Sequence, residues 1–209
     1  MVSRLRINPA VMSRRRPSDP TVFNDCDNIE RQMQEDGHKI WGWVIYRSDY
    51  SSEEDWQEFL RRLRQQIEKS LRRCGGLDML PTLDYHIFED KALYDGVDAA
   101  TIREHFRAWA ATASEQEQGG VGPGYSQRYI FCIQVDRDAL KSIVHNPFSP
   151  GDSEYRDNRG WVKLIWKDWE PAADDKMIWS TMNQSRALLW IMWVGAGRRT
   201  RKLCPPCTP

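Results

Sequence analysis

The strongest candidate for acid–base chemistry in this sequence is His86, which lies in the middle of a segment with the alternating pattern of a β-strand. Asp84 precedes it by two residues, so the two side chains share one face of that strand. A histidine beside a carboxylate can take up and release a proton near neutral pH. The alternative is a histidine that only forms a hydrogen bond at the edge of a sheet.

Aromatic residues are the second feature with the chemistry of a binding site. The chain has ten tryptophans, and several of them fall on predicted strands. They could line a pocket for a planar or polyprenyl substrate, or they could simply form the core. Combining a central-strand aromatic residue with a titratable and a basic one, we take His86, Trp43 and Arg128 as the candidate pocket.

Metal and cofactor sites are not expected. The five cysteines are odd in number and widely scattered, which favours reduced thiols. Cys204 and Cys207 have the spacing of redox and zinc motifs, but no second Cys or His pair accompanies them. The glycine-rich segment 119–124 lacks the Lys-Ser/Thr pair of a phosphate-binding loop.

The charge distribution bears on partners and localisation. Net charge is zero, but residues 1–16 and 198–209 are basic and contain no acid, so the body of the chain is acidic. Nucleic-acid binding is therefore not expected. No apolar run is long enough to cross a membrane. No secretory signal is recognisable, so we expect a cytoplasmic protein; a mitochondrial presequence is the alternative that the arginine-rich start leaves open.

The predicted elements that would position these residues begin at residue 40. Strands are expected over 40–46, 83–89, 128–135 and 160–166, from their β-branched and aromatic content. Apolar spacing of three and four residues predicts helices over 52–73, 99–111 and 137–144, and a glycine-rich loop over 114–124. Asp98, Asp136 and the segment 50–55 provide capping signals.

Leaving out the helix at 99–111, the order strand, helix, strand, strand, helix, strand is typical of the ferredoxin-like split βαβ sandwich. We therefore predict an α+β fold whose four-stranded antiparallel sheet has the order 4-1-3-2. The helices at 52–73 and 137–144 would cover one face. The extra helix, between strands 2 and 3, a homodimer or a ligand could cover the second face.

Three regions are expected along the chain: a flexible basic arm over 1–37, the ferredoxin-like domain over 38–170 and an atypical tail over 171–209. The tail is distinguished by composition, since all 30 acidic residues precede residue 177. The alternative is an amphipathic helix at the C-terminus that belongs to the fold.

The segments 41–47, 128–136 and 160–169 resemble a large family of uncharacterised proteins of filamentous ascomycete fungi, over roughly residues 38–170. The resemblance implies a cytoplasmic fungal protein from a lineage-restricted family, a kind of gene often found beside those of secondary-metabolite enzymes, and it implies no catalytic residue. Relatives continue after the last strand with an acidic stretch, which the tail of this chain lacks. A one-base shift of its back-translated codons restores such a stretch, so the tail reads as out of frame.

Two classes of function follow. The first is a cofactor-independent protein that handles a small molecule, as a cyclase, isomerase or accessory protein of fungal secondary metabolism. The second is a non-enzymatic interaction or dimerisation module that pairs through the second sheet face. A cavity of at least ~300 Å³ with convergent polar groups would favour the first, and a flat exposed apolar patch the second.

Overall fold

The computed structural model describes residues 25–145, 160–169 and 182–183. The helices in these ranges are α1 (Asp25–Asp36), α2 (Glu53–Arg73), α3 (Lys91–Tyr94), α4 (Ala99–Glu117) and α5 (Arg137–Val144), with short 3₁₀ turns η1 (Leu77–Thr82) and η2 (Gln127–Tyr129). The strands are β1 (Trp41–Arg47), β2 (Leu83–Phe88), β3 (Phe131–Val135), β4 (Trp161–Trp166) and the two-residue β5 (Met182–Asn183).

The strands form one mixed sheet in the order β2-β1-β3-β4-β5. β1 runs parallel to both β2 and β3, whereas β4 is antiparallel to β3 and to β5. The expected α+β class and the pairing of the first and third strands are confirmed. The antiparallel ferredoxin-like arrangement with the order 4-1-3-2 is wrong.

The helix between the second and third strands explains this correction. When that helix is included, the order of elements is βαβαβ, which is typical of parallel strands. The ferredoxin-like prediction left the helix out. A parallel connection needs a crossover of about a dozen residues or more. The 21 residues of α2 and the 19 residues of α4 both provide one. The connection from β1 to β2 and the connection from β2 to β3 are therefore both long enough for all three strands to run in the same direction.

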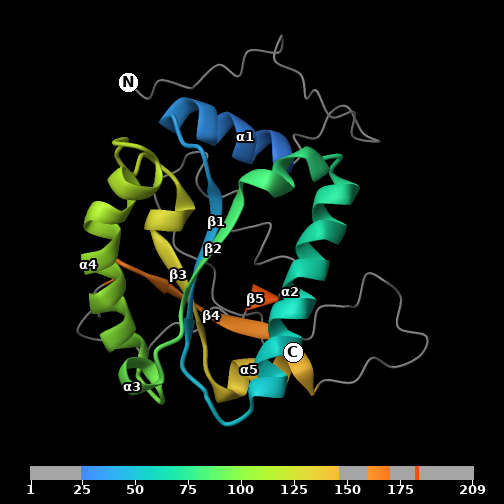
Figure 1. Cartoon of the computed structure of the whole chain (residues 1–209), viewed down its shortest axis with the longest axis vertical. Helices are drawn as coiled ribbons and strands as arrows, with labels where there is room; N and C mark the ends of the chain where they lie inside the picture. The colour runs from blue at the N-terminus through green and yellow to red at the C-terminus, as the bar shows by residue number, and fades with distance from the viewer. Residues whose placement is uncertain (1–24, 146–159, 170–181, 184–209) are drawn as a thin grey trace, which may run out of the picture.

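Helices cover both faces of the sheet (Figure 1). α2 and α5 pack on one face, as predicted, over a core that includes Trp43, Ile45 and Ile133. α4 packs on the other face, over Val44, Tyr46 and neighbouring aromatic residues. This second face is thus covered by the chain itself, and the homodimer expected through it stays a prediction.

The helix starts follow their capping signals. The side chains of Ser52, Asp98 and Asp136 accept hydrogen bonds from backbone N–H groups in the first turns of α2, α4 and α5. Each cap satisfies a donor that the helix leaves without a partner. At its other end α4 runs to Glu117, beyond the predicted 111 and into the segment expected to be a loop.

Two expected segments need correction near the amino end of β1. The arm expected over 1–37 contains α1, whose Cys26 and Ile29 are buried in the core of the first face. Cys26, Ile29 and Met33 are three and four residues apart, so they form one apolar stripe on the helix. Three apolar residues among polar ones are too weak a pattern to predict this helix from the sequence. Arg128 lies on the turn η2 and not on a strand, because β3 begins only at Phe131.

Most of the tail lies outside the described residues. Of residues 171–209 the structure describes Met182–Asn183, which pair with Val162 and Trp161 of β4. The out-of-frame hypothesis therefore stays a prediction. Among the described helices, none combines the length and apolarity that a bilayer crossing requires.

Candidate functional site

The site is organised by an ion pair between the half-buried Glu117, at the end of α4, and the buried Arg128, on the turn η2. The Arg128 side chain is only 1% exposed. Its Nε and Nη2 atoms donate to the two oxygens of Glu117, each at 2.8 Å. A two-pronged contact of this kind fixes both side chains, because the guanidinium and carboxylate planes must align.

Arg128 also holds the start of β2. Its Nη1 donates to the carbonyl of Asp84 at 2.9 Å, and its Nη2 donates to the Asp84 carboxylate at 2.5 Å. The same carbonyl faces Gly42 of β1, which has a φ of +131°. A Cβ at Gly42 would lie 2.0 Å from that oxygen. Only glycine allows β1 to approach β2 this closely.

Tyr129 and Gln118 extend the network to the start of β1. The Tyr129 hydroxyl donates to Glu117 at 2.9 Å and accepts from the Gln118 amide at 2.8 Å. The Gln118 oxygen accepts from the backbone N–H groups of Lys39 and Ile40, and its nitrogen donates to the carbonyl of Ile40. Gln118 thus replaces the backbone partners that a neighbouring strand would supply.

The ion pair determines the charge state of Glu117. Burial alone would raise the pKa of this carboxyl group. The hydrogen bonds from Arg128 and His86, together with the charge of Arg128, outweigh burial and lower its pKa to about 2. Glu117 is therefore ionised at neutral pH and cannot donate a proton there.

His86 reaches this network from β2. Its Nδ1 lies 3.3 Å from Glu117, and its side chain is 37% exposed. The ring packs between Phe88 and Trp109, with centroid distances of 4.6 and 4.9 Å. The structure thus brings two of the three predicted site residues, His86 and Arg128, to the same carboxylate.

The third predicted residue, Trp43, lies on the opposite face of the sheet. It is buried in the core under α2, and its indole stacks on Tyr85 at a centroid distance of 6.2 Å. Trp43 and His86 therefore share no pocket across the sheet. Trp43 and Arg128 do line one groove together, at the amino end of β1.

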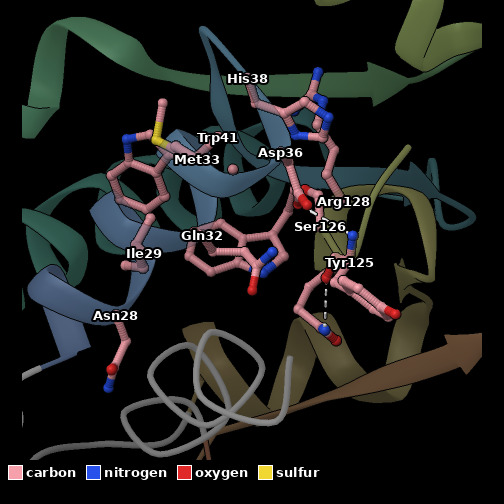
Figure 2. Close-up of a pocket in the computed structure, with 13 residues that line it drawn as sticks. Asn28, Ile29, Gln32, Met33, Asp36, His38, Trp41, Tyr125, Ser126 and Arg128 are labelled. Carbon is pink, nitrogen blue, oxygen red and sulfur yellow. Dashed lines mark hydrogen bonds between the residues drawn. The ribbon is translucent and has the colours of Figure 1, made fainter. Parts of the chain in front are cut away.

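This groove lies between α1 and the segment that precedes η2. Figure 2 shows Asn28, Ile29 and Met33 on one side and Tyr125, Ser126 and Arg128 on the other. The full lining is Asn28, Ile29, Gln32, Met33, Asp36, His38, Trp41, Gly42, Trp43, Tyr125, Ser126, Gln127 and Arg128. Its volume is about 60 Å³, room for a few heavy atoms and well below the ~300 Å³ of drug-sized sites.

Two of the residues that line the groove each have a buried amide atom without a hydrogen-bond partner: the Gln32 Nε2 donor and the Gln127 Oε1 acceptor. The Gln127 amide is oriented by its other end, since Nε2 donates to the Tyr125 carbonyl at 3.3 Å. The Asp36 carboxylate accepts from the backbone N–H of Tyr125 at 3.1 Å and thereby joins the two walls. An unpaired buried donor and acceptor cost free energy that a polar ligand would recover.

The opposite end of the sheet has a different character. Parallel sheets often bind ligands beyond the carboxyl ends of their strands, where Arg47 lies in this protein. The Arg47 guanidinium is buried over the rings of Tyr50 and Trp56, at 4.4 and 5.0 Å, and pairs with Glu53 at 2.7 Å. The Arg47 charge is therefore already paired within the fold.

Sequence reasoning missed Glu117, Gln32 and Gln127. Glu117 falls in a segment interpreted as a loop, and Gln32 falls in one interpreted as a flexible arm. Glutamines carry no motif that would single them out. In the described ranges, no group of three or more Cys, His, Asp or Glu side chains is arranged to hold a metal ion. The site can bind polar groups, but the Glu117 carboxylate is held ionised by Arg128.

Comparisons with known proteins add little to this geometry. The chain is 22% identical over 160 residues to the 1,4-alpha-glucan branching enzyme GlgB of Salinibacter ruber. The match covers 66% of this chain, and the chain spans only about a quarter, 24%, of that enzyme. No family model matches the chain, and no solved structure does. A similarity of this extent does not place the chain in a family.

Proposed function

We propose that the chain is a binding protein for a small molecule, which it holds by a polar group inserted into the groove between α1 and η2. The observation that carries this proposal is the pair of unpartnered amide atoms, Gln32 Nε2 and Gln127 Oε1, in the wall of one groove. Native proteins pair nearly all buried polar atoms. A polar group inserted between these two residues would supply both missing partners.

The groove also limits the ligand. A volume of about 60 Å³ admits only a few heavy atoms, so most of the ligand would lie outside, near the exposed ring of Tyr125. The inserted group must accept from Gln32 and donate to Gln127. A carboxamide or a hydroxyl group does both.

Binding without chemistry is favoured over a cyclase or isomerase activity. The carboxylate that lines the groove, Asp36, accepts from the backbone N–H of Tyr125 and joins the two walls. Glu117, which pairs with Arg128 beside the groove, is ionised and offers no proton at neutral pH. An accessory protein needs no such proton. The resemblance to the ascomycete family supplies the biological setting of this proposal, which is cytoplasmic secondary metabolism in a fungus.

Native mass spectrometry of the full chain, expressed in a filamentous fungus, tests the proposal. We expect the purified protein to carry a retained small molecule that denaturation releases. The variant Gln32→Met keeps the shape of the side chain and removes the orphaned donor. We expect it to lose the ligand while the ligand-free protein becomes more stable, by up to about 1 kcal/mol.

Gln118→Met is the matched control for this variant. Gln118 is buried and all of its amide atoms are paired, so its replacement should destabilise the protein by about 1–3 kcal/mol. A Gln32→Met protein that is destabilised like the control would contradict the proposal, because its amide would then already have a partner in the native protein.

The interaction module remains a second candidate because β2 lies at the edge of the sheet. Within the described part of the chain β2 pairs only with β1, and all six of its residues are half-buried. An open edge of this kind can add a strand from another chain. Light scattering at increasing protein concentration would test it, and a monomer at all concentrations would argue against a homodimer.

A further inference from the structure

Two cysteines that are far apart in the sequence meet where α1 crosses the end of α2. Cys26 lies in the first turn of α1 and is buried, and Cys74 is the C-terminal capping residue of α2 and is half-buried. The two thiols are joined by a hydrogen bond. Both are reduced in this structure.

The chain around the pair is built for this approach. Gly76 follows the end of α2, and a Cβ at this position would lie 2.3 Å from the Cys26 Sγ. Any larger residue would push Cys26 away from the end of α2. The backbone N–H of Gly76 bonds to the carbonyl of Leu71, which fixes the turn.

We propose that Cys26 and Cys74 form a reversible disulfide that links α1 to α2 when the protein is exposed to hydrogen peroxide. Cys74 is the attacking thiol because it is partly exposed, whereas Cys26 is buried. The hydrogen bond from Cys26 also lowers the pKa of Cys74 to about 7, against the effect of burial. A large share of Cys74 is then thiolate at neutral pH, the form that reacts.

The chemistry balances in two steps. The Cys74 thiolate attacks one peroxide oxygen, so an S–O bond forms, the O–O bond breaks and hydroxide leaves to become water. This step oxidises the sulfur to a sulfenic acid and reduces the peroxide. The Cys26 sulfur then loses its proton and attacks the Cys74 sulfur, forming the S–S bond and releasing a second water. A dithiol reductant reverses the result.

The disulfide would act on one wall of the groove. α1 contributes Asn28, Gln32 and Asp36 to that wall. A covalent link at the start of α1 would suppress its local opening, because it restricts the detached states of the helix. This consequence does not depend on the proposed ligand and can be measured without one.

The test uses the full chain with Cys204→Ser and Cys207→Ser, which leaves three cysteines. After one equivalent of hydrogen peroxide, peptide mapping should find Cys26 linked to Cys74 within one chain. Cys132 should stay reduced, since it is buried and burial raises the pKa of its thiol. Hydrogen exchange of the α1 amides should slow at least tenfold, and the thermal midpoint should rise by about 5 °C or more.

Two further variants separate the roles of the thiols. With Cys26→Ser, Cys74 should accumulate as a sulfenic acid that dimedone traps; with Cys74→Ser, neither link nor adduct should form. The proposal is overturned if peroxide leaves Cys26 and Cys74 unlinked while Cys132 reacts, if Cys74 stops at the sulfenic acid with Cys26 present, or if the link joins two chains.

Discussion

The two faces of the sheet are buried in different ways. The face under α2 and α5 is filled almost entirely by apolar side chains, and the polar atoms that enter it are few. One of them, the Trp41 Nε1, donates to the carbonyl of Met79 at 3.1 Å. The face under α4 combines aromatic rings with the buried Arg128 and Gln118 and the half-buried Glu117.

This difference separates two sources of stability. Apolar burial contributes in proportion to the area removed from water and does not depend on pH. A buried ion pair contributes only while both partners are present and charged, because either partner alone is costly to bury. We therefore expect the stability lost on substitution under α4 to depend on pH and on the partner residues. The stability lost on substitution under α2 should depend only on the side-chain volume removed.

The largest effect is expected when the ion pair is broken from one side. Arg128→Met leaves the half-buried Glu117 without its charged partner, so we expect the free energy of unfolding at pH 7 to fall by about 3 kcal/mol. Denaturant unfolding measures this loss. Arg64→Met, at an exposed position of α2, serves as the control and should change stability by less than about 0.5 kcal/mol. Equal effects of the two variants would contradict the comparison.

The matching change on the other face is Leu63→Ala. Leu63 is 3% exposed in the core under α2. Removing its side-chain volume should cost about 3 kcal/mol, as is typical for a buried leucine. The loss should be the same at pH 7 and pH 4, measured by the same unfolding experiment. A loss that shrinks with falling pH would show that this face, too, depends on charge.

Acid should act on the α4 face through Glu117. Its folded-state pKa of about 2 lies below its unfolded value of about 4.3. A carboxyl group whose pKa is lowered by folding stabilises the folded state at pH values above its unfolded-state pKa. This stabilisation is lost as the pH falls through the folded-state pKa. Between pH 5 and pH 2 we expect the wild type to lose about 2 kcal/mol more than Glu117→Gln, measured by urea unfolding. Parallel pH profiles of the two proteins would rule out this role.

The smallest effect concerns a helix end outside both interiors. Ser52→Ala removes the side chain that accepts from the Asp55 N–H at 3.1 Å, so it should cost about 1 kcal/mol. Ser52→Asn should restore most of the loss, because asparagine also caps well. In a Leu63→Ala background the cost should simply add, since the two sites are distant. A cost that disappears there would show that the cap and the core are coupled.

The candidate site illustrates what a sequence alone can predict. The alternating pattern of β2 correctly puts Asp84 and His86 on one face, and both reach the ion-pair network. Arg128, expected on a strand, lies on the turn η2 and is buried against Glu117 and Asp84, which the sequence did not predict. Trp43 belongs to the other face, because nothing in the sequence says which parity of β1 faces α4.

The sequence by itself determined those local elements that neighbouring residues specify strongly, although it missed α1 and the end of α4. Capping bonds at Ser52, Asp98 and Asp136 join groups three residues apart, and the apolar stripe of α2 repeats every three or four residues, so both can be predicted from neighbours. Strand direction and the partners of Glu117 were decided only by the tertiary structure. They depend on contacts between segments far apart in the chain, such as β1 with β3 and Asp84 with Arg128. The energy of such contacts appears only when the whole core forms.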